Sequence, residues 1–365
     1  MGSATVYEFA RRGRRVLGLE QFDVPNALAA YVGVTRIIRL AYSEHPSYVP
    51  LLLRAYELWR ALESAAGEPL LFITGGVDAG SESSWTIQGS LRSCNEHALA
   101  HRMMSADDVN REFPGYRLPQ DLVAVYQPDG GFVMSERCVV AHLNAALSAG
   151  AEIHGRERLM DWDASGGTVR VTTDRGRYEA GALVLTVGPW TPGVERQLRS
   201  SIVAERQVLL WAQPRRPEYF EVGRFPIFNM EVPEGRFYGF PMHSVPGFKI
   251  GKYHHRREAV QADSVDRTCH PADEAVLREG IRRYFPEADG PTLAMKVCMF
   301  ANTPDEHFVI DRHPAAENVI VAAGFSGHGF KFCSVVGEIV VDLATRGSTD
   351  FDVELFRMDR LTPRS

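Results

Sequence analysis

The length, composition and charge of this chain exclude several classes of protein. Its 365 residues are 45% hydrophobic and 24% charged, which is the profile of a globular protein with a full core, and this length predicts two domains. Forty Lys and Arg residues stand against 46 Asp and Glu residues, for a net charge of -6, so general nucleic-acid binding is not expected. No apolar run approaches the roughly 20 residues that a membrane span needs.

Two further features bear on the compartment of the protein. The N-terminus lacks the hydrophobic stretch of a signal peptide. The cysteines are widely spread and none lies in a CxxC pair, which argues against a disulfide framework and against a zinc ribbon; they are Cys94, Cys138, Cys269, Cys298 and Cys333. We therefore expect a protein of the reducing cytoplasm.

The N-terminal segment has the pattern of half a nucleotide-binding unit. The first fourteen residues predict a helix, because apolar residues form one face and Gly13 stands where a helix would end. The short apolar run at 16–20 then predicts a buried strand that ends in Glu20, and in dinucleotide-binding folds such an acid bonds a ribose hydroxyl. The strand and the G-x-G-x-x-G turn that should precede this helix are missing, and Met1 and Gly2 fit the last two positions of that motif. We expect the chain to start inside its own cofactor fingerprint.

The rest of the chain alternates between α/β and β-rich segments. An apolar stripe predicts a helix near 47–65, and two runs, 183–188 and 319–324, have the pattern of buried strands. Each of these strands ends in a glycine, Gly188 or Gly324, as strands do where a ligand approaches the backbone. Residues 202–252 alternate and are broken by turns, which predicts an antiparallel sheet. This order favours two interleaved domains.

Two arginines occur three residues apart in the segment TRIIR. We expect Arg36 and Arg39 to lie on one side of a helix turn, where guanidinium groups could bind a carboxylate with two hydrogen bonds. Two solvated surface arginines are the alternative, but the apolar neighbours Ile37, Ile38 and Leu40 favour a buried setting.

A glycine-rich turn follows the strand at 319–324. Its glycines let backbone N–H groups face an anionic or electron-rich ligand at the start of a helix predicted for 334–344. The turn also carries His328 and Lys331, which favours a ligand role over a purely structural turn. Gly327 and Gly329 are the expected backbone contacts.

Three other positions leave alternatives open. Lys249 lies in an apolar strand segment, so alternation predicts that it points to solvent; a buried cation there would instead stabilise developing negative charge. Cys298 lies among Val and Met residues, and the pattern alone predicts an inert core cysteine. His254 and His255 could supply a base or a metal pair, but adjacent histidines in a strand face opposite sides, so no metal site is expected.

Several segments together resemble the monomeric sarcosine oxidase and N-methyltryptophan oxidase family of flavin amine oxidases, over nearly the whole chain. The matching blocks are TRIIRLAYSEHPSYVPL (35–51), YGFP (238–241), FKIG (248–251), VCMF (297–300), DEHFVID (305–311) and GFSGHGFKF (324–332). The resemblance implies an α/β fold in which a Rossmann-like FAD-binding domain is interleaved with an antiparallel-sheet catalytic domain. The expected FAD domain comprises 1–71, 133–203 and 305–365, without its first strand. The expected catalytic domain comprises 72–132 and 204–304.

The resemblance also implies roles for individual residues. Cys298 matches the cysteine that joins FAD covalently through its 8α-methyl group, which reverses the inert assignment. Lys249 matches the lysine that speeds the reaction of the reduced flavin with O₂, and Arg39 and Lys331 match the pair that holds the substrate carboxylate. On the substrate side, the resemblance matches Tyr238 and His254, the latter across one inserted residue (Lys252 or Tyr253). On the cofactor side, the matching residues are Glu20, Arg36, Gly2, Gly188, Gly327, His328 and Gly329.

The implied activity is the FAD-dependent oxidation of N-methyl or cyclic secondary α-amino acids by a monomer, which yields an imine that hydrolyses and H₂O₂. The chain departs from the family pattern at 26–33, where small, polar and His positions have become Ala, Tyr31 and Val. It also carries Phe300 in place of a pocket tyrosine. Two alternatives therefore stay open: a truncated or decayed homologue with impaired FAD binding, and a dehydrogenase that passes electrons to a carrier.

Overall fold

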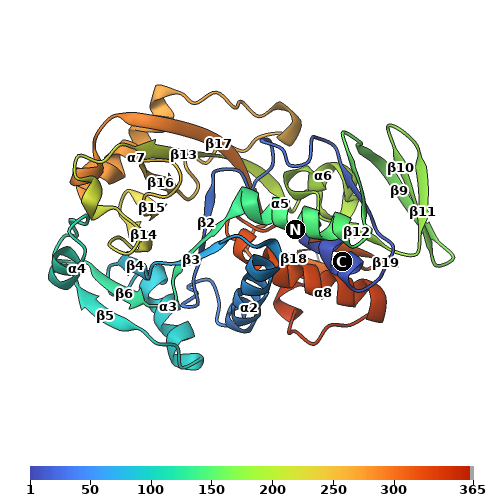
Figure 1. Cartoon of the computed structure of the whole chain (residues 1–365), viewed down its shortest axis with the longest axis horizontal. Helices are drawn as coiled ribbons and strands as arrows, with labels where there is room; N and C mark the ends of the chain where they lie inside the picture. Colours follow the sequence, from blue (N-terminus) through green and yellow to red (C-terminus); the bar gives the residue numbers. More distant parts are fainter. Residues whose placement is uncertain (362–365) are drawn as a thin grey trace.

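The computed structural model describes residues 1–361, and its mixture of helices and sheets confirms the predicted α/β class (Figure 1). The α-helices are α1 (Gly2–Arg11), α2 (Tyr48–Ala66), α3 (Trp85–Glu96), α4 (Ala106–Glu112), α5 (Ser135–Ser148), α6 (Thr191–Val194), α7 (Pro271–Tyr284) and α8 (Cys333–Arg346). The short 3-10 helices are η1 (Gly188–Trp190), η2 (Arg196–Leu198), η3 (Pro217–Tyr219), η4 (Ala262–Ser264), η5 (Pro286–Ala288), η6 (Phe330–Phe332), η7 (Glu354–Phe356) and η8 (Met358–Leu361). No helix between residues 1 and 361 combines the length and the apolar composition that crossing a bilayer requires.

The largest sheet has eight strands in the order β17-β13-β16-β15-β14-β4-β6-β5. These strands are β4 (Gly76–Gly80), β5 (Arg102–Ser105), β6 (Val123–Gln127), β13 (Val203–Ala212), β14 (Ile227–Val232), β15 (Gly235–Phe240), β16 (Phe248–Lys252) and β17 (Thr292–Asn302). The strands of 202–252 pair in the antiparallel sense, as predicted, and only the contact between β14 and β4 is parallel. Because β13 and β16 lie inside this sheet, nearly all their residues are buried.

Four smaller sheets complete the fold. They contain β1 (Leu17–Glu20) with β8 (Glu152–Gly155); β12 (Leu183–Leu185), β19 (Ala316–Ala323) and β18 (Val309–His313); β2 (Thr35–Ile38), β7 (Gly131–Met134) and β3 (Leu71–Ile73); and β9 (Leu159–Ser165), β10 (Thr168–Thr173) and β11 (Arg177–Ala180). In Figure 1 the strands β9 to β12 and β19 lie on the right, opposite β4 to β6 and β14 to β16.

Outside the large sheet, the pairs β1–β8 and β12–β19 are parallel. Helix α1 packs against α5 and α8, and α8 also packs against β19, so helices cover these strands as they do in parallel sheets. The apolar residues of β1 and most of β12 are only half-buried. Both strands line the cavity described below, and this position explains their incomplete burial.

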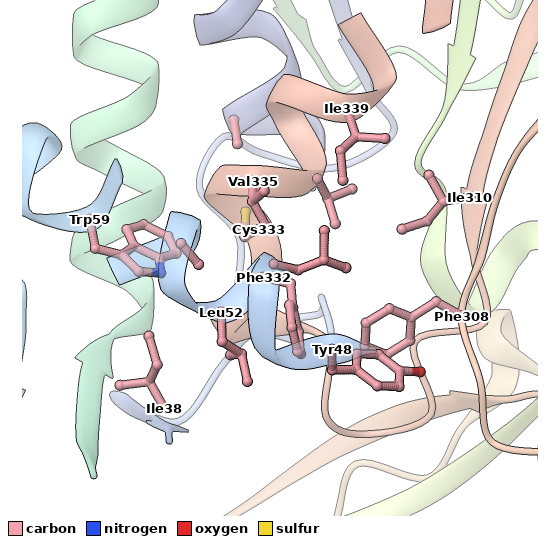
Figure 2. Packing of buried hydrophobic residues seen from close by; sticks show 14 of the residues in the cluster. Ile38, Tyr48, Leu52, Trp59, Phe308, Ile310, Phe332, Cys333, Val335 and Ile339 are labelled. Carbon is pink, nitrogen blue, oxygen red and sulfur yellow. The ribbon is translucent and has the colours of Figure 1, made fainter. Parts of the chain in front are cut away.

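One hydrophobic core joins segments that are far apart in the sequence (Figure 2). Tyr48 and Trp59 of α2 pack with Phe308, Phe332 and Ile339 from the last quarter of the chain, and all five are fully buried. A second core draws all its buried residues from between positions 77 and 297. The first core therefore brings the glycine-rich turn, which precedes η6 and α8, against the helix that follows β2.

The structure confirms most of the predicted elements and corrects two. The helix at the N-terminus, the strand before Glu20, the helix near 47–65 and the helix after the glycine-rich turn are all present. The strand predicted for 183–188 is shorter, since Gly188 already begins η1. The predicted helix turn at Arg36 and Arg39 is wrong, because 35–38 forms β2 and pairs with β7. The β-branched residues Thr35, Ile37 and Ile38 favour a strand, and three residues along a strand turn the second arginine to the opposite face.

Candidate active site

A large cavity lies between the parallel strand pairs and strands β15 and β17. Its volume is about 1710 Å³, whereas pockets for single small molecules measure roughly 300–1,000 Å³, so it has room for a dinucleotide and a second small molecule. Most of the residues singled out from the sequence line it: Gly2, Glu20, Arg36, Gly188, Tyr238, Cys298, Gly327, His328, Gly329 and Lys331. The other three, Arg39, Lys249 and His254, are held behind this lining by the contacts given below.

Cys298 lies in β17, opposite Gln207 of β13. It is buried, as its apolar neighbours predicted, and it also lines the cavity, which the pattern alone did not predict. Burial raises the pKa of the Cys298 thiol, while the positive charges of Arg36 and Lys249 oppose that rise. The thiol therefore lies at the cavity with its pKa held above the ordinary value by burial.

Lys249 does not point to solvent, and the prediction from alternation is wrong. The side chain is 2% exposed, because both faces of the central strand β16 are covered. Its Nζ donates hydrogen bonds to the carbonyl oxygens of Gly33 and Thr35, both at 2.7 Å, and to the Thr35 hydroxyl at 2.9 Å. It also lies 4.0 Å from the centre of the Phe240 ring. Burial, with the like charge of Arg36, lowers the pKa of Lys249 well below its ordinary value.

Arg36 orders the loop in which this chain departs from the family pattern. Its guanidinium donates to the carbonyl oxygen of Ala30 at 3.0 Å and to that of Val32. The Glu136 carboxylate accepts hydrogen bonds from the next two backbone N–H groups, those of Gly33 and Val34. Tyr31 from the same loop lines the cavity, and its hydroxyl accepts a hydrogen bond from the Asn26 backbone N–H at 3.0 Å. The loop is thus held by the arginine that faces the cavity.

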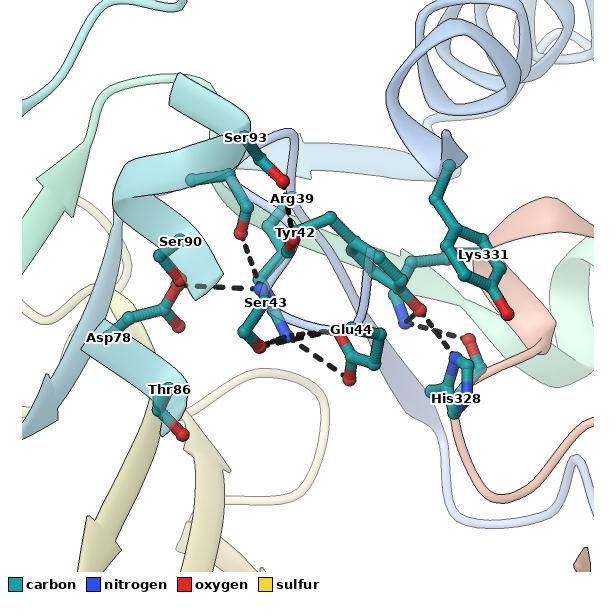
Figure 3. Close-up of polar contacts among 12 residues, drawn as sticks. Arg39, Tyr42, Ser43, Glu44, Asp78, Thr86, Ser90, Ser93, His328 and Lys331 are labelled. Carbon is teal, nitrogen blue, oxygen red and sulfur yellow. Dashed lines mark hydrogen bonds and ion pairs between the residues drawn. The ribbon is translucent and has the colours of Figure 1, made fainter. Parts of the chain in front are cut away.

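Arg39 is buried between two carboxylates (Figure 3). Its Nη2 lies 3.0 Å from Glu44 Oε2, and its Nη1 lies 3.4 Å from Asp78 Oδ2. The guanidinium also donates to the Ser43 hydroxyl at 3.1 Å, and Ser90 donates to Asp78 at 2.7 Å. The two negative charges outweigh the desolvation of Arg39 and raise its pKa; despite its own burial, the pKa of Glu44 is lowered by Arg39. The expectation of a buried setting for Arg39 is therefore confirmed.

Lys331 and His328 form the opposite part of this polar cluster. Lys331 Nζ donates to the His328 carbonyl oxygen at 2.8 Å and to the Tyr42 hydroxyl oxygen at 3.4 Å. Tyr42 lies 2.6 Å from His328 Nδ1, and His328 Nε2 lies 2.9 Å from the Glu306 carbonyl oxygen (Figure 3). Since that carbonyl can only accept, His328 carries its proton on Nε2. Burial lowers the pKa of Lys331 to about 7 and that of His328 to about 4.

Three aromatic side chains form one wall of the cavity. The ring centres of Tyr238 and Tyr253 are 5.1 Å apart, and those of Tyr253 and Phe300 are 5.8 Å apart. The Arg236 guanidinium lies 3.6 Å from the centre of the Tyr253 ring, which fixes that ring from behind. Burial raises the pKa of Tyr238 and that of Tyr253, so both hydroxyls are neutral hydrogen-bonding groups at physiological pH.

The two adjacent histidines lie beyond the end of β16, in a turn rather than in a strand. His254 lies between Glu205 and Glu306, and it is its neighbour Tyr253 that lines the cavity. His255 is fully buried beside Asp273, at 3.4 Å. The two imidazoles thus face different partners, and Tyr253 rather than His254 takes the inward position.

Sequence reasoning missed four residues of the site: Tyr42, Glu44, Asp78 and Tyr253. Tyr42 and Glu44 stand inside the TRIIRLAYSEHPSYVPL block, where an acid close behind Arg39 was the available signal. Asp78 is an acid in a strand of small residues, GVDAG, a setting in which a charge is buried only when it is paired. No local pattern marks Tyr253.

The residues around the cavity fit the parts of FAD. Glu20 ends β1 and lines the cavity, and a carboxylate in this place can accept hydrogen bonds from a ribose. Gly2 begins α1 at the cavity, and the free N–H groups of a helix N-terminus suit a phosphate. Gly188 has a φ of +55° and open space where a Cβ would lie, which leaves room for a ligand against the backbone.

Residues 1–343 of this chain match the model of the family described as FAD dependent oxidoreductase. The chain belongs to this family. Within it, a monomeric sarcosine oxidase from Streptomyces avermitilis is 42% identical and covers 99% of this chain and 95% of its own length. An N-methyl-L-tryptophan oxidase from Salmonella dublin is 32% identical, with coverages of 99% and 96%.

A solved structure of similar fold supports the architecture. The open form of NikD, described as an unusual amino acid oxidase essential for nikkomycin biosynthesis, superposes with a TM-score of 0.83 at 26% identity, over 97% of this chain and 94% of its own. The family match and the sequence relatives confirm the predicted membership in the sarcosine oxidase and N-methyltryptophan oxidase family.

Proposed function

We propose that this protein is an FAD-dependent oxidase of N-methyl or cyclic secondary α-amino acids, which releases an imine and H₂O₂. An N-methyl imine then hydrolyses to the amino acid and formaldehyde. The observation that carries this proposal is the single cavity in which the Cys298 thiol, the Lys331 ammonium and an aromatic wall meet. The similarity to sarcosine oxidases and to an N-methyl-L-tryptophan oxidase supports the substrate class.

The substrate carboxylate binds to Lys331. The ammonium carries three N–H donors, and two of them are directed at His328 and Tyr42, so one remains for a ligand. Arg39 provides a second positive charge behind it, but Glu44 already neutralises this charge. A substrate carboxylate must therefore compete with Glu44 for Arg39, so Glu44 weakens the binding of the substrate.

The aromatic wall orients the amine and keeps water from the reacting carbon. Tyr238 and Tyr253 can each accept or donate a hydrogen bond through a neutral hydroxyl, and Phe300 closes the wall without a polar group. FAD, when bound, supplies the chemistry that removes a hydride equivalent from the carbon next to the neutral amine. Fixing that carbon against the cofactor is the contribution of the protein.

Cys298 is the proposed point of covalent attachment. Its thiol lines the cavity, and the cations of Arg36 and Lys249 lie close enough to oppose the effect of burial on its pKa. Denaturing the purified yellow protein in acid tests the attachment: the colour should stay with the precipitated protein, and Cys298→Ser should release it. Colour that remains entirely in the supernatant of the unsubstituted protein would refute the covalent bond.

O₂ is the proposed electron acceptor, and Lys249 the residue that favours its reaction. Three oxygens accept hydrogen bonds from Lys249 Nζ, which favours the protonated form against the effect of burial. That ammonium stabilises negative charge that develops on oxygen. The alternative is a dehydrogenase that passes electrons to a carrier, and it predicts that substrate bleaches the protein without forming H₂O₂.

Three coarser features complete the proposal. We divide the chain into an FAD domain (1–71, 133–203, 305–365, of which 362–365 lie outside the described part) and a catalytic domain (72–132, 204–304). The two main cores, which fall almost wholly on either side of this division, support it. The protein is proposed to act as a monomer, because a similar sarcosine oxidase is named as monomeric. It is also proposed to act in the cytoplasm, in keeping with five free cysteines.

A substrate panel with peroxide detection tests the proposed function. Sarcosine, N-methyltryptophan, pipecolate and proline all present a carboxylate and a secondary amine, and at least one of them should yield H₂O₂ in proportion to the substrate consumed. A colourless yet compact preparation that does not take up added FAD would instead favour the decayed homologue.

A further inference from the structure

His254 is bonded to a carboxylate on each side of its ring. Its Nδ1 lies 2.9 Å from Glu205 Oε2, and its Nε2 lies 2.8 Å from Glu306 Oε1. A carboxylate only accepts hydrogen bonds, so both ring nitrogens must donate, and the ring is an imidazolium. Charge-assisted hydrogen bonds of this kind are stronger than neutral ones, and the side chain is only 30% exposed.

One of the two carboxylates is fixed and the other is held in place by His254. Glu205 belongs to β13 and also accepts hydrogen bonds from Asn302 at 2.8 Å and from Gln207 at 2.7 Å. Glu306 lies in the turn after β17, with a φ of +59°, and His254 itself has a φ of +52°. Non-glycine residues adopt this left-handed conformation only where the surroundings enforce it. The ion pair therefore joins two strained turns.

The turn that carries Glu306 is bonded to the wall of the active site. It is also held by the Thr303 carbonyl oxygen, which accepts from the Glu306 N–H at 3.2 Å, and by the ion pair of Arg360 with Asp305 at 2.8 Å. The Glu306 carbonyl oxygen accepts the hydrogen bond from His328 Nε2 at 2.9 Å, which fixes the tautomer of His328. Through its Nδ1, His328 then accepts from the Tyr42 hydroxyl, and its carbonyl oxygen accepts from Lys331 at 2.8 Å. A continuous set of hydrogen bonds thus runs from His254 to the ammonium that binds the substrate carboxylate.

We propose that His254 is a positioning residue, whose imidazolium holds the Glu306 turn and through it sets the place of His328 and Lys331. This inference rests on the proposed function for the role of Lys331, but it assigns His254 no contact with substrate or cofactor. The groups that face the imidazolium are Glu205 from β13 and Glu306 from the turn, with the amide of Asn302 and, next to Glu306, the Arg236 guanidinium.

The protonation of His254 predicts how substrate binding depends on pH. The two carboxylates raise the pKa of His254 to about 9, so the imidazolium persists at neutral pH and is lost as the pH rises through about 9. Loss of the charge releases Glu306, and substrate binding should weaken in that range while the chemical step stays nearly unchanged.

His154 provides a matched control. It also lies between two carboxylates, Glu157 at 2.9 Å and Glu152 at 2.7 Å, and it is 31% exposed. Its β8 position gives it no hydrogen bond to His328. Replacing His154 by Gln therefore removes the same kind of clamp from a place that does not touch the proposed set of bonds.

The experiment compares H254Q and H154Q as holoproteins. For H254Q we expect about a tenfold rise in KM for the best substrate of the panel, as for other partners that orient a binding group, with kcat within about twofold. The additional rise in KM near pH 9, beyond the one that Lys331 itself causes above pH 7, should disappear. Acetate, as a probe of the carboxylate site measured by calorimetry, should bind H254Q about tenfold more weakly, and nitrogen NMR of labelled histidine should show His328 losing its single Nε2–H tautomer.

Other results would overturn the inference. If H254Q and H154Q behave alike in KM, acetate affinity and the His328 signal, the clamp has no link to the site. Should H254Q not fold, E306Q, which removes the other charge, must give the same rise in KM and the same loss of the pH 9 step, and an unchanged KM would refute the proposal. If no secondary amino acid is oxidised, the proposed function fails on its own, while acetate binding and the His328 signal still decide the role of His254.

Discussion

Two buried lysines, Lys331 in the cavity lining and Lys249 behind it, differ in how fully their ammonium groups are bonded. Lys249 directs its three N–H donors at the carbonyl oxygens of Gly33 and Thr35 and at the Thr35 hydroxyl, all within 2.9 Å. Lys331 has one acceptor at 2.8 Å and a second, weaker one at 3.4 Å. Neither lysine forms a direct ion pair in the described chain, and burial lowers the pKa of both.

This difference separates a fixed charge from a binding charge. Because Lys249 is satisfied by neutral oxygens, it can act on a reaction through its field but has no donor left for a ligand. Lys331 keeps a donor and lies at the cavity, so an incoming carboxylate completes its bonding. Substitutions that remove one charge or the other should therefore affect different steps of the same reaction.

Lys249→Met should give the largest effect. Removing a preorganised charge near developing negative charge costs about 10²–10³-fold in rate, and the loss should fall on the reaction of the reduced protein with O₂. Stopped-flow absorbance measures the two half-reactions separately, and reduction by substrate should change far less. Equal losses in both half-reactions would contradict the role given to Lys249.

Lys331→Met should act on substrate binding instead. Loss of the partner of a buried carboxylate should lower kcat/KM about a hundredfold, mostly through KM, and should leave the reaction with O₂ intact. Steady-state kinetics with Lys331→Arg as a charge-conserving control checks this. If Met and Arg are equally harmful, the ammonium is not needed for its charge.

The pH dependence of anion binding should sharpen the comparison. In the ligand-free protein Lys331 loses its proton near pH 7, and a bound carboxylate favours the protonated form. Binding of acetate must then take up a proton above pH 7, so its affinity should fall by up to about tenfold per pH unit. Calorimetry in buffers of different ionisation enthalpy detects the proton, and Lys331→Arg should abolish both effects.

Glu44→Gln should have the smallest effect, and it should strengthen anion binding rather than weaken it. The substitution removes the carboxylate that competes for Arg39, while Asp78 still partners the guanidinium. Acetate should bind a few times more tightly, by roughly the 0.5–1 kcal/mol expected when a competing pair is weakened rather than removed. Weaker binding would mean that Glu44 orients Arg39 for the ligand.

Sequence patterns predicted the helices and strands better than they predicted the surroundings of individual side chains. The periodicity of 47–65 and the alternation of 202–252 predicted a helix and a sheet, because each reflects contacts of a residue with near neighbours in the chain. The burial of Lys249 and the pairing of Arg39 with Asp78 depend on segments about 40 to 200 residues away, which no local pattern reports. Alternation fails at Lys249 because β16 is covered on both faces.

The family resemblance supplied what the patterns lacked, but only where residues correspond. It marked Cys298 and Lys331, which line the cavity. It did not mark Tyr253, which lines the cavity, whereas His254, expected on the substrate side, lies against Glu205 and Glu306. The conformation of a turn decides which of two neighbouring side chains faces inward, and only the coordinates resolve that.

Anaerobic mixing of the yellow protein with sarcosine, followed by admission of O₂, tests the central claim most directly. The account predicts that the visible absorbance bleaches with substrate, that it returns with O₂, and that one H₂O₂ forms for each molecule of substrate consumed. Absorbance that stays unchanged with sarcosine and with every other secondary amino acid of the panel would contradict the assignment as an amine oxidase.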